Sequence, residues 1–245
     1  MKFVILDTET TGIDEQDRVI QLGFMVLESG AKTEVYNELF SSTVEISIPA
    51  METHGITPQM LKGKAKIEDS KSFKRLFELN SDENYLIIHN AKFDLDMLKK
   101  DGFNSQMRLI DTLRVSRHIY PDEKAHRLQY FRYKLELYKQ EQDEAKKLGV
   151  EVKAHDAIGD VLILKLLLTH LKKDIQAKFP DENPIEKMLK LTNEPIITEK
   201  FSFGKHKDKT IAQVAKTDKG YLEWMLTQNL DEDLRYSISL ALKSS

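Results

Sequence analysis

The chain begins with short apolar runs that have the spacing of strands. The first run, Phe3 to Leu6, is branched and apolar, as in a buried central strand. Two further strands are predicted over Arg18 to Leu27 and Tyr36 to Phe40, with Ser29-Gly30 marking the turn between them. Because these strands follow one another closely, we expect antiparallel pairing beside the first strand.

After these strands, helical and strand patterns alternate. Apolar residues take helical spacing from Lys71, return to a strand pattern at Tyr85 to His89, and become helical again over Phe93 to Lys100. The charge-rich stretch from Leu128 to Lys147 predicts a solvated helix, and Ile158 to Leu171 predicts an apolar one. Strands interleaved with helices indicate an α/β domain with a mixed sheet.

A domain boundary is predicted where prolines cluster. Pro180 and Pro184 lie within a short polar stretch, where they oppose helix continuation. We therefore expect a first domain over residues 1–179, a linker over 180–184 and a small α+β module over 185–245. From Pro184 onward there are ten Lys and Arg against nine Asp and Glu, so the acidic excess belongs to the first domain.

Composition excludes several classes of protein. The 245 residues carry a formal net charge of −3, which argues against a globally basic nucleic-acid-binding surface but not against a local one. The sequence has no cysteine, which excludes a disulfide scaffold, a Cys-ligated zinc site and a thiol nucleophile. No apolar run is long enough for a membrane span and no secretory signal is visible, so we expect no membrane partner and a cytoplasmic location.

Two carboxylates end the first predicted strand. Side chains alternate along a strand, so Asp7 and Glu9 project from one face about 7 Å apart. Burying two carboxylates without a partner is costly, and a divalent cation with a preference for oxygen, Mg²⁺ or Mn²⁺, removes that cost. The alternative is that both are exposed strand-end acids beside a turn.

Two later segments carry further candidate groups. Asp94 follows the strand at Tyr85 to His89 and would come to the end of the same sheet. His155 precedes the apolar helix, and Asp160 lies one turn into it. A lone histidine there is more often a helix-start residue than a catalyst, but an acid on an apolar helix needs a partner.

These segments resemble the three motifs of the DEDDh 3′–5′ exonucleases over residues 1 to about 175. D-T-E-T-T-G from Asp7, H-N-A-x-F-D ending at Asp94 and H-D-A-x-x-D from His155 stand in the family's order. An I-P…H-G-I-T segment, with H-G-I-T at 54–57, and D-T-L at 111–113 match as well. The resemblance implies a ribonuclease H-like mixed five-stranded sheet flanked by helices. At position 21 many relatives carry Glu, whereas this chain has Gln21, from which we expect little consequence.

The family resemblance also implies a mechanism. Asp7, Glu9, Asp94 and Asp160 would bind two Mg²⁺ or Mn²⁺ ions, and His155, in the histidine subtype, would take the proton from the attacking water. The implied activity is 3′–5′ hydrolysis of DNA, with single-stranded or frayed ends preferred, releasing nucleoside 5′-monophosphates in repair or proofreading. Substrate contacts are expected from residues that match the family at the same site, namely Thr10, Gly12, His54, Ile56 and Asn90.

The small module combines basic and aromatic residues. From Lys200 to Lys219 there are six lysines and two acids. Lys205, Lys207 and Lys209 are expected to contact nucleic acid, so that the module tethers DNA, although it could instead dock a replication or repair protein. The segment resembles a C-terminal module of some exodeoxyribonuclease X-like proteins. Its four aromatic residues could stack on bases, but we expect them to form the module's core: Phe201, Phe203, Tyr221 and Trp224.

Three other functions compete with a DNA exonuclease. The same five catalytic residues would serve a 3′–5′ exoribonuclease, because nothing in the sequence decides recognition of a 2′-hydroxyl. A non-catalytic accessory subunit could keep the fold, although the intact catalytic positions argue against it. A small-molecule phosphohydrolase would show metal-dependent cleavage without a preference for polymers.

Overall fold

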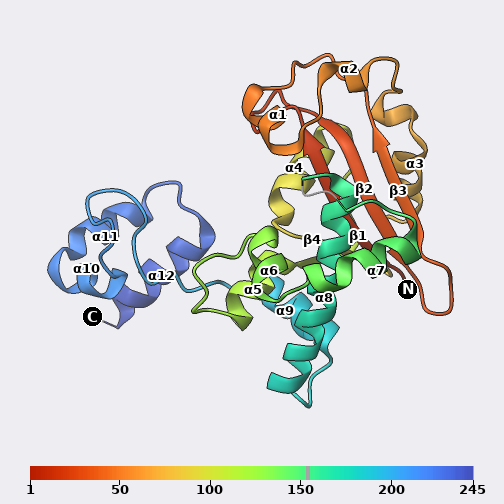
Figure 1. Ribbon diagram of the computed structural model, residues 1–245. Coiled ribbons are helices and arrows are strands. Elements are labelled where there is room, and N and C mark those ends of the chain that lie inside the picture. The colour runs from red at the N-terminus through yellow and green to blue at the C-terminus, as the bar shows by residue number, and fades with distance from the viewer. Residues whose placement is uncertain (153–154, 245) are drawn as a thin grey trace. The chain divides into compact units, whose positions relative to one another are not determined.

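A computed structural model describes residues 1–152 and 155–244 of the chain, which divides into two compact units (Figure 1). The first unit comprises Met1–Thr192, and the second begins at Asn193.

The first unit is built on a five-stranded mixed sheet with the order β3-β2-β1-β4-β5. β1 pairs antiparallel with β2 and parallel with β4, β2 pairs antiparallel with β3, and β4 pairs parallel with β5. This confirms the predicted antiparallel group and the predicted five-stranded α/β fold. The strands are β1 (Phe3–Thr10), β2 (Val19–Leu27), β3 (Glu34–Leu39), β4 (Tyr85–Ile88) and β5 (Arg108–Asp111).

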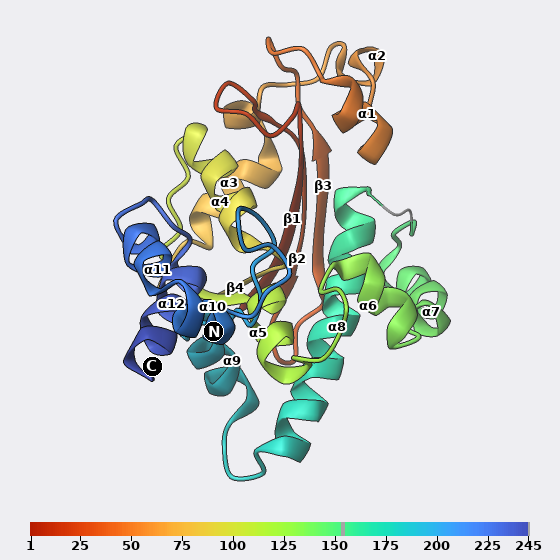
Figure 2. The same ribbon diagram turned by 90° about the vertical axis from the view of Figure 1, so that its left-hand side faces the viewer.

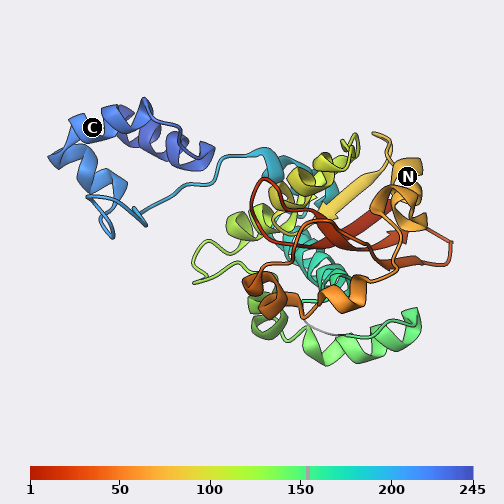
Figure 3. The same cartoon turned by 90° about the horizontal axis from the view of Figure 1, so that it is seen from above.

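Helices cover both faces of the sheet, because the central strands are apolar on both sides (Figure 2). Ile5 of β1 faces a core built with the long helix α8, whereas Val4 and Leu6 face a core built with α3 and α4. α8 lies against β1 and β2 (Figure 3). The helices of the α8 face are α5 (Thr112–Ile119), α6 (Leu128–Lys134), α7 (Tyr138–Leu148), α8 (Ala157–Lys178) and α9 (Pro184–Asn193), and those opposite are α3 (Lys71–Glu78) and α4 (Ala91–Lys100).

Short helices in the segment between β3 and α3 form a small core of their own. Ile20 of β2 packs with Ile46, Ile56 and Leu61 from this segment. The elements here are α1 (Ile48–His54), α2 (Pro58–Leu61) and the 3₁₀ helix η1 (Ile67–Asp69).

The charge-rich stretch from Leu128 to Lys147 is not the single solvated helix that we predicted. It forms two helices, α6 and α7, and Glu136 between them has a left-handed φ of 52°. Phe131 and Leu137 are fully buried in the α8-side core. The prediction from the high charge overlooked these few large apolar residues, whose burial determines the path of the chain.

The domain boundary lies later than we predicted. In place of the predicted linker at 180–184, residues 180–183 form a turn and Pro184 begins α9, because proline is compatible with the first turn of a helix. Met188 and Leu191 of α9 bury their side chains in the core of the first unit. The first unit therefore extends to Thr192 instead of ending at residue 179.

The second unit is helical. Among its described residues the structure has α10 (Ile211–Thr217), α11 (Lys219–Leu226) and α12 (Glu232–Lys243), together with one isolated β-bridge between Lys200 and Thr210. The predicted α+β composition is therefore wrong in its strand content. None of the helices among the described residues combines the length and apolarity that a membrane crossing requires.

Candidate active site

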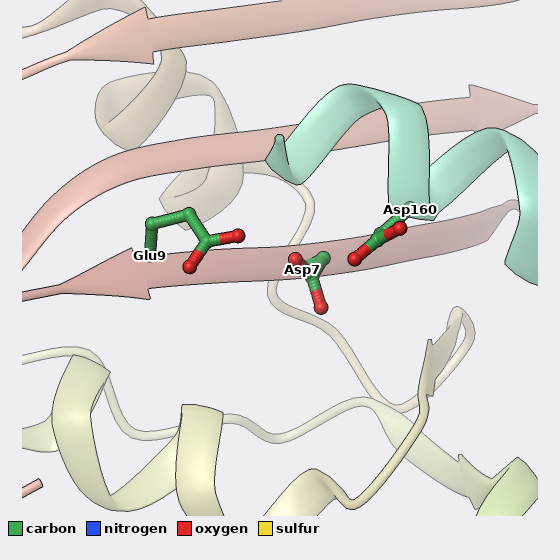
Figure 4. A group of neighbouring side chains, drawn as sticks. All are labelled: Asp7, Glu9 and Asp160. Carbon is green, nitrogen blue, oxygen red and sulfur yellow. The ribbon is translucent and has the colours of Figure 1, made fainter. Parts of the chain in front are cut away.

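Two carboxylates lie side by side at the end of β1. Asp7 and Glu9 stand two positions apart on the same face as Ile5, the face that α8 covers (Figure 4). In the β1–β2 ladder their partners are Gly23 and Gln21. The spacing predicted from the sequence is therefore present, and it directs both side chains toward the first turn of α8.

Asp160 completes a group of three carboxylates. It lies in the first turn of α8 and is only 8% exposed. Carboxylate oxygens of Asp7, Glu9 and Asp160 lie within 4.8 Å of one another, a spacing at which one cation could be shared. Gln129 Nε2 donates a hydrogen bond of 2.7 Å to Asp160 Oδ1 and so helps to fix its orientation.

Asp94 reaches the same end of β1 from α4. It is 3% exposed, and its Oδ1 accepts hydrogen bonds from the backbone N (3.0 Å) and the Oγ1 (2.7 Å) of Thr8. Thr8 lies between Asp7 and Glu9 in sequence but points to the opposite face. Asp94 is not in the group of three, but its negative charge contributes to raising the pKa of both Asp7 and Glu9.

The four carboxyl groups resist ionisation together. Burial, with added repulsion from neighbouring carboxylates, raises the pKa of Glu9 to about 8 and that of Asp7 well above its usual range. Burial raises the pKa of Asp94 to about 7, against the hydrogen bonds from Thr8. Burial also raises the pKa of Asp160 to about 6, opposed by the charge of His155.

This donor set fits a divalent cation. The ligands are carboxylate oxygens, which suit hard ions such as Mg²⁺ or Mn²⁺ better than soft ones. Buried like charges repel one another, and a bound cation would replace that repulsion with attraction. Asp7, Glu9 and Asp160 are the residues that could hold it directly, with Asp94 beside them.

His155 lies at the entrance to α8. It is exposed, and its backbone has a left-handed φ of 57°, a conformation that few non-glycine residues adopt. A protonated imidazole here would favour the ionised form of Asp160, as does a hydrogen bond from the backbone of His155. The imidazole is therefore next to the carboxylate group and open to solvent.

Thr10, Gly12 and His54 line a cavity of about 450 Å³ next to Glu9. Thr10 Oγ1 donates to Gly12 O at 2.6 Å, and a side chain at Gly12 would collide with the carboxylate of Asp17. His54 is 4% exposed; its Nε2 lies 3.1 Å from Thr10 O, and its Nδ1 accepts from the backbone N of Ile56. The histidine thus ties α1 to the end of β1.

The other expected substrate contacts lie in different settings. Ile56 is buried and lines a second cavity, of about 460 Å³, which His54 lines as well. Asn90 is exposed at the N-terminus of α4 in a left-handed conformation, φ 72°, with its backbone N held by Asp111. Three lysines belong to the second unit, are exposed, and are not placed relative to the carboxylates: Lys205, Lys207 and Lys209.

Residues outside the predicted motifs also hold the site together. Gln21, from which we expected little consequence, bonds Asp156 and Ala157 at the start of α8. Gln129, which donates to Asp160, accepts a hydrogen bond of 3.2 Å at its Oε1 from Arg132 Nη1. The guanidinium of Arg132 also forms a bidentate pair with the buried Glu141. The i, i+3 spacing of Gln129 and Arg132 on one helix could have indicated their mutual contact, whereas no local pattern indicates that of Gln21 with α8.

The aromatic residues of the second unit divide into two kinds. Phe201 is buried in its core, whereas Phe203 and Trp224 are 51% and 55% exposed. Tyr221 is partly buried, and its ring centroid lies 5.6 Å from that of Trp224 and 4.8 Å from that of His206. The prediction that all four form the core is therefore wrong for Phe203 and Trp224, because α10–α12 supply enough aliphatic side chains.

Comparison with known proteins gives matches over both units. A family model described as an exonuclease matches residues 4–168, and one described as an exodeoxyribonuclease X-like C-terminal matches residues 201–230. Exodeoxyribonuclease 10 of Escherichia coli is 27% identical, over 98% of this chain and 99% of its own length. The PolC-type DNA polymerase III of Clostridium perfringens is 28% identical over 71% of this chain, which spans only 12% of that polymerase.

Solved structures share the fold. The structure of exonuclease X in complex with 5′ overhanging duplex DNA has a TM-score of 0.56 and 24% identity, covering 78% of this chain and 99% of that one. A zinc-bound E. coli exonuclease I complex with single-stranded DNA has a TM-score of 0.52 and 18% identity, covering 76% of this chain and 42% of that one. At these levels of sequence identity the similarity shows a shared fold and no more.

Proposed function

The chain belongs to the DEDDh exonuclease family, and on that premise we propose that it hydrolyses phosphodiester bonds from the 3′ end of DNA, releasing nucleoside 5′-monophosphates. The observation that carries the proposal is the convergence of Asp7, Glu9 and Asp160 within 4.8 Å, with Asp94 alongside. The relatives named as exodeoxyribonuclease 10 and PolC-type polymerase support DNA as the substrate, and a role in repair or proofreading.

The four carboxylates would hold divalent cations, and we propose Mg²⁺ or Mn²⁺. Bound there, such ions lower the pKa of water and offset negative charge on the phosphate. Asp7 lies between Glu9 and Asp160 (Figure 4), which supports the proposal that its carboxylate would serve more than one ion. Without a cation the acidic cluster would repel DNA, so metal should be needed for binding at the site as well as for cleavage.

His155 would accept the proton of the attacking water. Its exposure gives it access to solvent and substrate, and an imidazole has a pKa suited to proton transfer near neutral pH. Its position directly before α8 keeps it next to Asp160. The cavity beside Glu9, lined by Thr10, Gly12 and His54, is proposed to receive the 3′-terminal nucleotide, and Ile56 and Asn90 are proposed as further substrate contacts.

The test of this function uses matched DNA and RNA oligonucleotides, single- and double-stranded, each labelled at its 5′ end. With Mg²⁺ or Mn²⁺, we expect a descending ladder on DNA that is absent with a chelator and fastest on single-stranded or frayed ends. A ladder only on RNA would overturn the DNA assignment and favour a 3′–5′ exoribonuclease. No cleavage of any polymer would overturn the exonuclease and favour an accessory subunit.

We further propose that the second unit binds the DNA strand outside the catalytic site. Lys205, Lys207 and Lys209 are exposed, and the exposed Trp224 offers a surface on which a base can stack. Trp224 is the single tryptophan of the chain, so tryptophan fluorescence, excited at a wavelength that tyrosine does not absorb, reports on this unit. Titrating the full chain with oligo(dT) in a chelator should quench that fluorescence, and an unchanged spectrum at saturating DNA would contradict this role.

A further inference from the structure

Two residues of β2 seat the first turn of α8. Gln21 and Gly23 are the ladder partners of Glu9 and Asp7, and they share a face with them. A Cβ atom at Gly23 would lie 2.7 Å from Ala157 C and from Ile158 N, so the helix backbone rests directly on the strand. The strand positions opposite the two carboxylates are therefore those that bring Asp160 to them.

The amide of Gln21 makes contacts from both of its ends. Nε2 donates to Asp156 Oδ1 at 2.7 Å and to Asn37 Oδ1 at 3.0 Å, whereas Oε1 accepts from the backbone N of Ala157 at 3.3 Å. Asp156 is the N-cap residue of α8, yet its side chain makes no cap hydrogen bond. The Gln21 side chain, 136 residues earlier in the sequence, instead accepts a hydrogen bond from the first backbone N–H group of the helix, that of Ala157.

We propose that Gln21 is a positioning residue, which acts through Asp156 and Ala157 to hold His155 and Asp160 in place against Asp7 and Glu9. This inference rests on the proposed function, because it assigns His155 and Asp160 their roles. His155 is exposed and adopts a left-handed backbone, so its neighbours must supply its order. Displacements of about 1 Å at a catalytic group can cost ~100-fold in rate.

A charge exchange tests the proposal without changing the shape of either side chain. Gln21→Glu places a carboxylate against that of Asp156 and should lower kcat at least ~10-fold, with KM for DNA changed much less. Adding Asp156→Asn restores a donor–acceptor pair in the opposite sense, since the new amide can donate to the new carboxylate. We expect the double variant to recover to within ~3-fold of wild type. Asp156→Asn alone keeps an acceptor for Gln21 and should lower kcat less than Gln21→Glu does.

A matched control makes the same substitution elsewhere. Gln140→Glu lies on an exposed position of α7 and should leave kcat and KM unchanged. Wild-type kcat in Gln21→Glu would overturn the proposal. So would a loss in that variant that Asp156→Asn does not restore, because that would indicate only a weakened fold.

A spectroscopic measurement separates this inference from the proposed function. In metal-free protein the Cε1–Hε1 resonance of His155, assigned by its loss in His155→Ala, should shift in Gln21→Glu and return in the double variant. If wild type cleaves no nucleic acid, the proposed function fails, but this resonance still shows whether Gln21 sets the environment of His155. An unmoved resonance would overturn the positioning role even in an active enzyme.

Discussion

Aspartates in the two units of this protein have opposite electrostatic surroundings. At the end of β1, burial and neighbouring acids raise the pKa values of Asp7, Asp94 and Asp160. In the second unit Asp218 lies at the surface, and hydrogen bonds from Lys205 and His206 lower its pKa to about 2. The ionised form of an aspartate is therefore disfavoured in one unit and favoured in the other.

The difference shows which charges have a function that the fold alone does not explain. Asp218 is satisfied by its own neighbours, which is the usual arrangement for a structural acid. The carboxylates at β1 accept hydrogen bonds from Thr8, Gln129 and the backbone of His155, but burial and mutual repulsion still raise their pKa values, so their ionised forms reduce stability unless a cation binds. Effects at β1 should be large and depend on metal, whereas those in the second unit should be small and depend on salt.

The largest expected effect comes from removing one charge at β1. Asp7→Asn should reduce turnover ~1,000-fold or more, because a neutral amide is a poor ligand for a hard cation. Degradation of a 5′-labelled oligonucleotide under saturating Mg²⁺ measures it. Asp143→Asn, at an exposed position of α7, is the control. Near-wild-type turnover in Asp7→Asn would contradict the metal-dependent mechanism and the functional difference proposed between the aspartates of the two units.

His155→Ala should cost ~100-fold in turnover while leaving metal binding intact, because the imidazole moves a proton and is not expected to be a metal ligand. Single-turnover rates and calorimetric titration with Mn²⁺ measure the two properties separately. His170→Ala, further along α8, serves as the matched control. A loss of Mn²⁺ affinity equal to the loss of rate would show that His155 supports the site rather than the proton transfer.

The stability of the metal-free protein should reveal the repulsion directly. The pKa of Glu9 is raised to about 8 in the folded chain, so its ionisation destabilises the fold progressively from about pH 4.5 to 8. Glu9→Gln should therefore equal wild type near pH 4.5 and melt ~3 °C or more higher at pH 8.5.

Thermal melting in a chelator across that pH range tests the sign. Saturating Mg²⁺ should reverse the order at pH 8.5, since the wild type alone keeps all its carboxylate ligands. A wild type that is the more stable of the two in chelator at pH 8.5 would show that the cluster is not repulsive.

The smallest effect is expected in the second unit. Replacing both Lys207 and Lys209 with Ala should weaken DNA binding ~3- to 10-fold at low salt and reduce the salt slope by up to ~2, because each lysine that contacts a phosphate releases about one counterion. Fluorescence anisotropy over a salt series measures it, and Lys172→Ala with Lys173→Ala, exposed on α8, is the control. An equal effect in the control pair would mean that the second unit has no preferred contact with DNA.

Most strands and helices of the first unit, and the chemistry of its carboxylates, could be predicted from the sequence alone. Alternation along a strand places Asp7 and Glu9 on one face whatever surrounds them, and the apolar helix after His155 made a partner for Asp160 necessary. Local patterns of this kind come from backbone geometry and from the cost of burying charge. Both operate over a few residues, so they could be predicted before the fold was known.

The groups that support those carboxylates come from distant parts of the sequence and could be identified only from the folded chain. Gln21 bonds Asp156, which lies 135 positions later in the sequence. Met188 of α9 packs in the core of the first unit, although it follows the prolines from which we predicted a domain boundary. Trp224 is left exposed because other residues fill the core of the second unit. Each of these outcomes depends on which surfaces pack together and what volume remains, a property of the whole fold that no local pattern contains.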